Sequence, residues 1–309
     1  MIEIKKLTKR FGTLVAVDHL DLQIGAGDIF GFIGPNGAGK TTTMRILVTL
    51  MEPTSGFASI DGLDVTRKGK DVRRRVGYMP DFMGVYDDLK VFEYLEFFAA
   101  AFGIEYRKRK AIVEGVLELT DLTSKQSAQV DSLSRGMQQR LGLARVLIHD
   151  PKVLILDEPA SGLDPRARIE IRELLRELKR MGKTIMISSH ILSELEEICD
   201  QIGIIERGQL VFGGTMEEIR PRLGIQGKVR VKVLADQTAR ATELLTTLSQ
   251  IQQVEAVGDY LSVTFREGEQ VDGVIARTLV GGGVDLITLQ PEQLKLDDAF
   301  LKLTKGIIH

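Results

Sequence analysis

Several residue types that would point to particular classes of protein are scarce or missing in this chain of 309 residues. It has no tryptophan, and its single cysteine, Cys199, has no partner for an internal disulfide, which fits a reducing compartment. The four histidines lie far apart and no CxxC or HxxxH pair occurs, so a structural zinc site is not expected. A formal net charge of −2 gives no general attraction to nucleic acid, and we expect no nucleic-acid partner.

Long apolar runs are also missing. The best candidate for a membrane span, residues 91–104, is short and is interrupted by Glu93 and Glu96, which favours an amphipathic helix. Residues 1–6 carry no apolar region of the kind found in signal peptides. We therefore expect a soluble cytoplasmic chain.

The most informative stretch is a phosphate-binding loop at residues 34–41, which matches the pattern G-x-x-x-x-G-K-[ST] in full. An apolar run at residues 29–33 predicts a strand before it, and the apolar spacing of residues 42–50 predicts a helix after it. Glycines let the backbone wrap an anion with its N–H groups, and the helix N-terminus adds positive potential. Lys40 can neutralise the β- and γ-phosphates, and the Thr41 hydroxyl can hold Mg²⁺. A chance glycine-rich turn is the alternative, and the flanking strand and helix disfavour it.

A second motif supplies two carboxylates. Residues 153–158, Val-Leu-Ile-Leu-Asp-Glu, form a continuous apolar run typical of a strand covered on both faces, followed by Asp157 and Glu158. Asp157 would hold Mg²⁺ through its water shell, and Glu158 would polarise the water that attacks the γ-phosphoryl group. The plainer interpretation is that the two acids only keep the strand end soluble.

The order of the predicted elements indicates two domains. Strands and helices alternate up to about residue 220, which predicts an α/β domain with a helical insert at about residues 82–145. Proline and glycine cluster at residues 221–227 and mark a boundary. Residues 228–309 then follow the order β-α-β-β-α-β, with helices expected at 237–251 and 271–279 and a terminal helix at 291–304. This order predicts a small α+β ferredoxin-like domain.

A third motif narrows the class. Residues 133–140, Leu-Ser-Arg-Gly-Met-Gln-Gln-Arg, open a helix that Ser134 can cap. With the phosphate loop and the acidic strand in this order, residues 1–220 resemble the ATP-binding-cassette (ABC) family, whose signature is LSGGQ. The resemblance implies a P-loop NTPase cassette with a helical subdomain, which binds ATP and Mg²⁺ and hydrolyses ATP. The form of the signature is similar to that of the bacterial exporter branch that includes drug-resistance and Nod-factor systems.

The resemblance also implies roles for individual residues. Glu158, His190 and Lys40 would be catalytic, with His190 bonded to the γ-phosphate. Phe11 would stack on adenine, although it could be an ordinary aromatic residue in a turn. Ser134 and Gly136 would contact ATP held by the opposite subunit, and Asp164 belongs to the D-loop that lines the dimer seam. The implied nucleotide-binding set is Phe11, Gly34, Pro35, Asn36, Gly37, Ala38, Gly39, Lys40, Thr41, Thr42, Asp81, Ser134, Gly136 and Asp164.

The sequence departs from the family pattern at two places. Arg135 and Met137 stand in the signature where the family usually has Gly and Gln, although Ser134 and Gly136 are kept. Asp81 stands where the family has the glutamine that reaches Mg²⁺. A shorter, charged side chain could ligate the metal directly or leave it to water, so Asp81 joins Thr41 and Asp157 as a candidate metal ligand.

The resemblance implies partners as well. Two copies of the chain, or one copy and a paralogous ATPase, would close over two ATP molecules at the cytoplasmic face of the cell membrane. Transmembrane permease subunits would dock beside the helical insert, where Phe82, Met83 and Val85 could form an apolar contact or a buried loop. The alternatives are an ATPase that acts on nucleic acid or ribosomes and a small-molecule phosphotransferase. Export is favoured only by resemblance, and the cargo stays open. Residues 228–309 resemble the accessory domain of such exporter ATPases, for which we expect a dimer-contact or regulatory role.

Overall fold

The computed structural model describes residues 1–82, 84, 88–222, 228–266 and 273–291. The chain forms two compact units, residues 1–216 and 217–309. The division lies at the start of helix α8 (Met216–Arg222), so the limit expected near residue 220 falls inside this helix. Within the described residues, no helix combines the length and the apolar character needed to cross a membrane.

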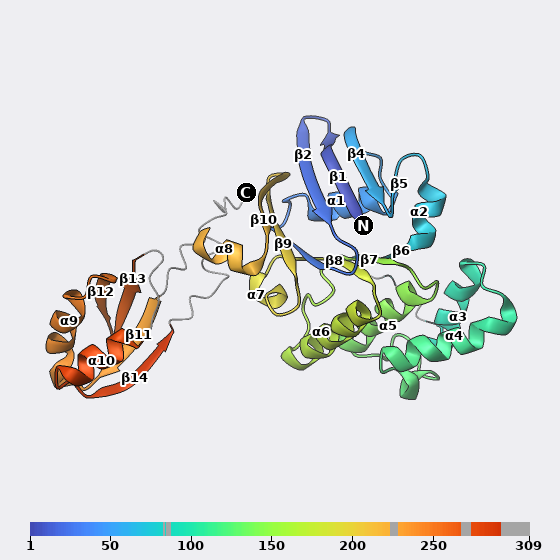
Figure 1. Ribbon diagram of the computed structural model, residues 1–309. Helices are drawn as coiled ribbons and strands as arrows, with labels where there is room; N and C mark the ends of the chain where they lie inside the picture. The colour runs from blue at the N-terminus through green and yellow to red at the C-terminus, as the bar shows by residue number, and fades with distance from the viewer. Residues whose placement is uncertain (83, 85–87, 223–227, 267–272, 292–309) are drawn as a thin grey trace. The chain divides into compact units, whose positions relative to one another are not determined.

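The first unit is built on a six-stranded sheet (Figure 1). Five of its strands pair in parallel with their neighbours, and β10 closes one edge in antiparallel pairing with β9. The residues of β3, β7 and β8 are all buried, as expected for strands that are covered on both faces. In sheet order the strands are β10 (Gln209–Gly214), β9 (Gln201–Glu206), β3 (Ile29–Ile33), β8 (Thr184–Ser189), β7 (Val153–Leu156) and β6 (Val76–Met79).

A second, antiparallel sheet packs over this one, in the order β2–β1–β4–β5. Helix α1 (Lys40–Leu47) lies beneath it in Figure 1, and residues of both sheets and of α1 share one apolar core that includes Ile4, Phe32 and Met44. The strands are β1 (Ile2–Phe11), β2 (Leu14–Ile24), β4 (Ser55–Ile60) and β5 (Leu63–Asp64). Strand β1 thus extends to Phe11, and the turn before β2 lies at residues 12–13.

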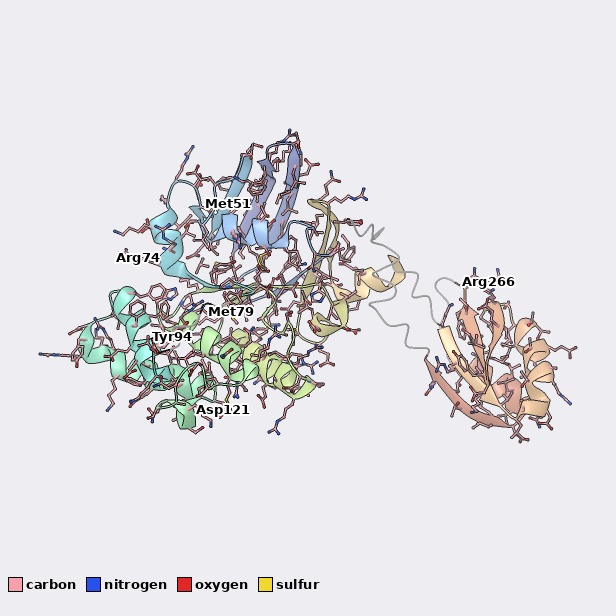
Figure 2. The ribbon with its side chains drawn as sticks, turned by 180° about the vertical axis from the view of Figure 1, so that it is seen from behind. Met51, Arg74, Met79, Tyr94, Asp121 and Arg266 are labelled. Atoms are coloured by element: carbon pink, nitrogen blue, oxygen red, sulfur yellow. The ribbon has the colours of Figure 1, made fainter. Side chains whose placement is uncertain are left out.

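A group of helices is inserted between β6 and β7. Helix α3 packs against α4 and α5 around the buried Tyr94, which Figure 2 shows inside the unit, whereas Asp121 and Arg74 lie at its surface. Helix α6 follows β7 and is amphipathic, with Asp164 capping its first turn and Pro165 as its first residue. The helices of this unit other than α1 and α8 are α2 (Gly69–Arg75), α3 (Val91–Ala101), α4 (Tyr106–Leu119), η1 (Thr123–Lys125), α5 (Arg135–Leu147), α6 (Pro165–Arg180) and α7 (Leu192–Leu195).

The second unit has the predicted ferredoxin-like order. Its four strands are antiparallel to their neighbours and lie in the order β12–β13–β11–β14, and their inner residues share a core with α9 and α10. In chain order the elements are β11 (Lys228–Val233), η2 (Ala235–Gln237), α9 (Thr238–Thr246), β12 (Ile251–Val257), β13 (Tyr260–Phe265), α10 (Val274–Gly281) and β14 (Leu286–Pro291).

Two helices were predicted for this unit with bounds that the structure does not reproduce or does not describe. The helix predicted over residues 237–251 is wrong at its C-terminal end, because α9 stops at Thr246 and Ile251 pairs with Phe265 as the first residue of β12. The terminal helix predicted over residues 291–304 lies outside the described residues, except for Pro291, which ends β14.

Candidate nucleotide site

The phosphate loop runs from the end of β3 to the start of α1, as the sequence predicts. Two of its glycines have left-handed backbone angles, Gly37 at φ 79° and Gly39 at φ 111°, which other residues rarely adopt. A Cβ atom on Gly39 would also lie 2.5 Å from the Ala16 carbonyl oxygen of β2, so a side chain has no room there. The glycines therefore fix the path of the loop as well as exposing its N–H groups.

Lys40 is held inside this loop, with only 6% of its side chain exposed. Its Nζ donates hydrogen bonds to the Gly34 and Pro35 carbonyl oxygens and lies 3.5 Å from Glu158 Oε1. Burial lowers the pKa of Lys40, and the charge of Glu158 opposes that change. A phosphate oxygen entering the loop would offer this ammonium group a stronger partner than the two carbonyls.

A cavity of about 160 Å³ opens over the loop. Asp81 and Glu158 face it from the ends of two neighbouring strands, β6 and β7, whose carboxyl ends meet at one edge of the sheet. The lining residues are Ala16, Pro35, Asn36, Gly37, Ala38, Gly39, Lys40, Thr41, Thr42, Asp81 and Glu158. The structure thus brings most of the predicted nucleotide-binding residues together in one place.

Asp157 is buried at the base of this site and accepts two hydrogen bonds. Thr41 Oγ1 donates to its Oδ2 at 2.7 Å, and Ser188 Oγ donates to its Oδ1 at 2.6 Å. Ser188 also accepts a hydrogen bond from the Glu158 backbone N–H at 2.9 Å. The sequence analysis assigned no role to Ser188, which is the last residue but one of β8, the strand next to β7.

Glu158 has an unusual backbone and a close partner. Its φ of 51° is left-handed, which costs a non-glycine residue about 1–2 kcal/mol. Its Oε2 lies 2.9 Å from Nδ1 of His190, and its side chain is 12% exposed. The strained turn therefore aims the carboxylate between Lys40 and His190, at the mouth of the loop.

The donor set beside Lys40 suits Mg²⁺. The Thr41 hydroxyl and the Asp157 carboxylate are hard oxygen ligands that already lie in contact with each other. Asp81 adds a third oxygen donor group to the same cavity. Burial raises the pKa of Asp81, the charges of Asp157 and Glu158 raise it further, and Arg135 and His190 oppose the change.

Five of the predicted nucleotide-binding residues do not line this cavity, namely Phe11, Gly34, Ser134, Gly136 and Asp164. Phe11 ends β1 with 45% of its surface exposed, and Nζ of Lys9 lies 5.2 Å from the centroid of its ring. Ser134 caps α5 by accepting the Met137 N–H, and Asp164 caps α6 by accepting the Ala167 N–H at 3.0 Å. A Cβ on Gly136 would lie 3.0 Å from the Ala167 Cβ, so this glycine lets α5 and α6 approach closely.

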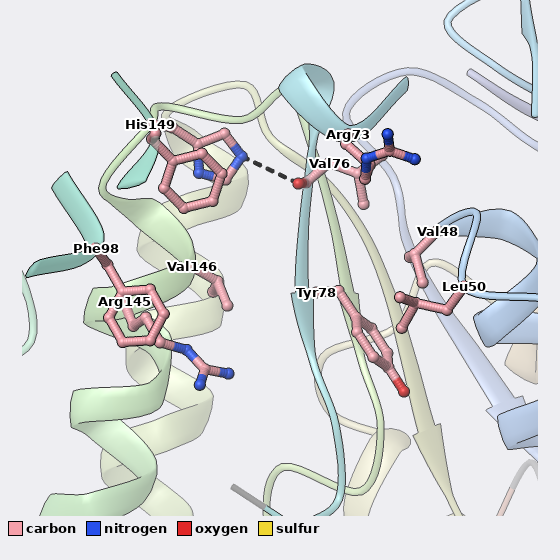
Figure 3. A pocket seen from close by; sticks show the side chains of 10 residues that line it. Val48, Leu50, Arg73, Val76, Tyr78, Phe98, Arg145, Val146 and His149 are labelled. Carbon is pink, nitrogen blue, oxygen red and sulfur yellow. Dashed lines mark hydrogen bonds between the residues drawn. The ribbon is translucent and has the colours of Figure 1, made fainter. Parts of the chain in front are cut away.

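A second cavity, of about 250 Å³, lies between β6 and the inserted helices (Figure 3). Tyr78 of β6 and Val146 of α5 both line it, and the Tyr78 ring points toward Leu50 in Figure 3. His149 stacks on Phe102 with the ring centroids 3.9 Å apart, and its Nε2 lies 3.0 Å from the Val76 carbonyl oxygen. The lining residues are Val48, Leu50, Arg73, Val76, Tyr78, Phe98, Phe102, Arg145, Val146 and His149.

Comparisons with known proteins agree with this geometry. The model of a family described as "ABC transporter" matches residues 17–161. The bacitracin transport ATP-binding protein BcrA of Bacillus licheniformis is 38% identical over 99% of this chain and 98% of its own length. The Nod factor export ATP-binding protein I of Cupriavidus metallidurans is 37% identical over 98% of this chain and 97% of its own length.

Solved structures with a similar fold also come from ABC transporters. A structure described as the ATP binding subunit of an ABC transporter has a TM-score of 0.65 and 30% identity, covering 73% of this chain and 94% of that one. The cbiO1 protein of Clostridium perfringens has a TM-score of 0.65 and 26% identity, covering 72% of this chain and 92% of that one. The chain belongs to the ABC transporter family, as an ATPase subunit related to exporter ATP-binding proteins.

Proposed function

We propose that this subunit drives export across the cytoplasmic membrane by closing with a second copy of itself, or with a paralogous ATPase, over two molecules of Mg²⁺-bound ATP. The observation that carries the proposal is the separation of two sets of residues. The phosphate loop and Glu158 line one cavity, whereas Ser134 and Gly136 do not line it. A second chain can supply these two residues to the open side of the nucleotide. Closure would then depend on the γ-phosphate, which both chains contact.

The residues of the loop cavity suit phosphoryl transfer to water. Lys40 and the loop N–H groups would bind the phosphates, and His190 would hold the Glu158 carboxylate in place through their 2.9 Å contact. Glu158 would orient the attacking water and accept its proton. Thr41 and Asp157 would hold Mg²⁺, with Asp81 as a third candidate ligand, and the metal would neutralise charge on the phosphoryl oxygens.

The cavity beside α3 and α5 is our candidate for the docking site of a permease subunit. Leu50 and Phe102, which line it, are 63% and 44% exposed, so an apolar side chain of a partner can be buried there. Arg73 and Arg145 line the same cavity and favour an acidic residue beside that apolar group. Such docking would hold the chain at the cytoplasmic face of the membrane. Of the three residues that the sequence offered for this docking contact, Phe82 is 85% exposed. Met83 and Val85 lie outside the described residues.

The substitution Glu158→Gln tests the proposal. It removes the base but keeps the size of the side chain, so we expect retained ATP binding, a stable dimer with Mg²⁺ and ATP, and phosphate release slower by at least about 100-fold. Phosphate release and size-exclusion chromatography with light scattering measure both effects. The matched control is Glu173→Gln on α6, outside the loop cavity. Normal phosphate release, or a monomer at saturating ATP, would contradict the proposal.

A further inference from the structure

One face of α6 carries a row of arginines that contact the segment between β8 and β9. Arg168, Arg172 and Arg176 stand four residues apart, so they lie on the same face of the helix. Nη1 of Arg168 lies 3.0 Å from Oε1 of Glu194, and Nη1 of Arg172 lies 2.5 Å from Oε2 of Glu197. Arg176 donates to the Glu197 carbonyl oxygen at 3.1 Å. The arginine row therefore joins α6 to that segment.

The first pair of the row differs from the second in the burial of its carboxylate. The Glu194 side chain is 11% exposed and its Oε1 is buried, whereas the Glu197 side chain is 58% exposed. Water and salt screen a pair with an exposed carboxylate, but a buried carboxylate depends on the cation that faces it. Removing Arg168 should therefore disturb its surroundings more than removing Arg172.

Arg168 also contacts the turn that leads from β7 to α6. Its Nε donates a hydrogen bond to the Leu163 carbonyl oxygen at 3.0 Å. Leu163 is buried, and the turn before it is closed by a hydrogen bond from the Ser161 N–H to the Glu158 carbonyl oxygen at 3.1 Å. One guanidinium group thus contacts this turn through Nε and α7 through Nη1. Its planar, rigid set of donors suits two such contacts at once.

Both segments that Arg168 joins lie next to residues of the candidate site. His190, which lies 2.9 Å from Glu158, comes two residues before the start of α7. Its side chain is 41% exposed, so its position depends strongly on the backbone that follows it. Asp164, which the family resemblance assigns to the dimer seam, comes directly after Leu163. The contacts of Arg168 therefore connect the backbone beside His190 with the backbone beside Asp164.

We propose that Arg168 and Glu194 hold the turn before α6 against α7, so that His190 and Asp164 keep a fixed relative position when two chains close over ATP. Arg168 acts through Leu163 and Glu194 and is a positioning residue. Without this Arg168–Glu194 bridge, closure would have to order the two segments against each other, which costs conformational entropy. The inference rests on the proposed function for its dimer readout.

The test compares Arg168→Gln with Arg172→Gln, which removes the next arginine of the row and leaves the contacts of Arg168 in place. Both are made in the Glu158→Gln chain. The ATP concentration for half-maximal dimer formation, measured by light scattering, should rise about tenfold for Arg168→Gln and less than about twofold for Arg172→Gln. Single-chain affinity for a fluorescent ATP analogue should change less than about twofold in both, because neither arginine lines the loop cavity. A purely structural defect would weaken both quantities together.

Hydrogen exchange of the nucleotide-free chain tests the bridge without any dimer. Arg168→Gln should speed amide exchange by at least about threefold in both residues 159–163 and residues 191–195. Glu194→Gln should speed exchange in the same two segments, and Arg172→Gln in neither. Unchanged exchange in either segment of Arg168→Gln, or equal shifts of dimer formation for the two arginine variants, would overturn the inference. If the Glu158→Gln chain stays a monomer at saturating ATP, the proposed function fails, while hydrogen exchange still decides whether the bridge exists.

Discussion

At the scale of single residues, the site depends on hydroxyl groups as much as on carboxylates. Ser188 donates to Asp157 and accepts from the Glu158 N–H, so one hydroxyl sets the positions of both acids. Thr41 holds the other oxygen of Asp157. Groups that orient metal ligands in this way change activity without touching the substrate.

Replacing Ser188 by alanine should therefore impair turnover. We expect Ser188→Ala to lower kcat by about 10- to 100-fold while ATP affinity changes little, because the phosphate loop keeps its own contacts. Steady-state ATPase kinetics and equilibrium nucleotide binding measure the two quantities. Ser189→Ala is the control, since the Ser189 hydroxyl contacts Glu194 and the Ile191 N–H and not the two acids. Equal losses in the two variants would contradict a special role for Ser188.

At the scale of the element, helix α6 buries the apolar residues that its sequence places at helical spacing. Its apolar residues recur at helical spacing, and Leu175 is fully buried, whereas Ile169 on the same helix is 50% exposed. Helix α6 packs against α5, and it follows β7, the strand whose end carries Asp157 and Glu158. The stability of α6 therefore supports the geometry of the site.

Truncating the buried face should cost far more than truncating the exposed one. We expect Leu175→Ala to lower the free energy of unfolding by about 2–5 kcal/mol, because it leaves a cavity. Ile169→Ala should cost less than about 1 kcal/mol. Urea denaturation followed by circular dichroism measures both. Similar costs for the two variants would mean that α6 does not pack as described.

His149 makes the junction between β6 and the inserted helices sensitive to pH. Burial lowers the pKa of His149 below the ordinary value of 6.5. The hydrogen bond to the Val76 carbonyl oxygen and the charge of Asp150 oppose this change, and the charge of Lys183 adds to it. Well above pH 6.5 the ring is neutral in both the folded and the unfolded state. As the pH falls below 6.5, the unfolded chain binds the proton first, so the folded state loses stability.

Replacing His149 should remove part of that loss. The melting temperature of the unsubstituted protein should fall between about pH 7 and pH 5.5, and that of His149→Gln should fall less, because glutamine can still donate to Val76 but does not titrate. Differential scanning fluorimetry measures the slopes, with His19→Gln at an exposed histidine as the control. Identical slopes for His149→Gln and the unsubstituted protein would refute this account.

At the scale of the whole molecule, the two units have separate cores. The cluster around Phe32 and Met44 lies within residues 1–216, and the cluster around Val231 and Phe265 lies within residues 217–309. Each unit therefore buries its own apolar surface, which is the physical requirement for folding alone. All the residues that line the nucleotide cavity belong to the first unit.

A fragment of residues 1–222 should consequently fold by itself and bind ATP. We expect one cooperative thermal transition and an ATP affinity within about threefold of that of the full chain, since no lining residue is removed. Calorimetry and nucleotide titration test this directly. An aggregated or non-binding fragment would show that the first unit needs the second.

Local spacing along the chain specifies several elements of this protein. Residues 34–41 specify the phosphate loop because each position has a conformational or chemical requirement that few residues meet. The apolar run before Asp157 and the β-α-β-β-α-β order after residue 228 likewise follow from periodicity along the chain. These features suffice to indicate the fold and the family, because each depends only on residues close together in the sequence.

Contacts between side chains that are far apart in the sequence follow only from the packing of the whole unit. Ser188 between two carboxylates, the Arg135 guanidinium over Gly162 and the His149 ring on Phe102 join residues that no local pattern relates. Helix α9 ends at Thr246 rather than near residue 251 for the same reason, since Ile251 is drawn into pairing with Phe265. Spacing along the chain encodes local backbone preferences, whereas contacts between remote segments exist only after the whole unit has packed.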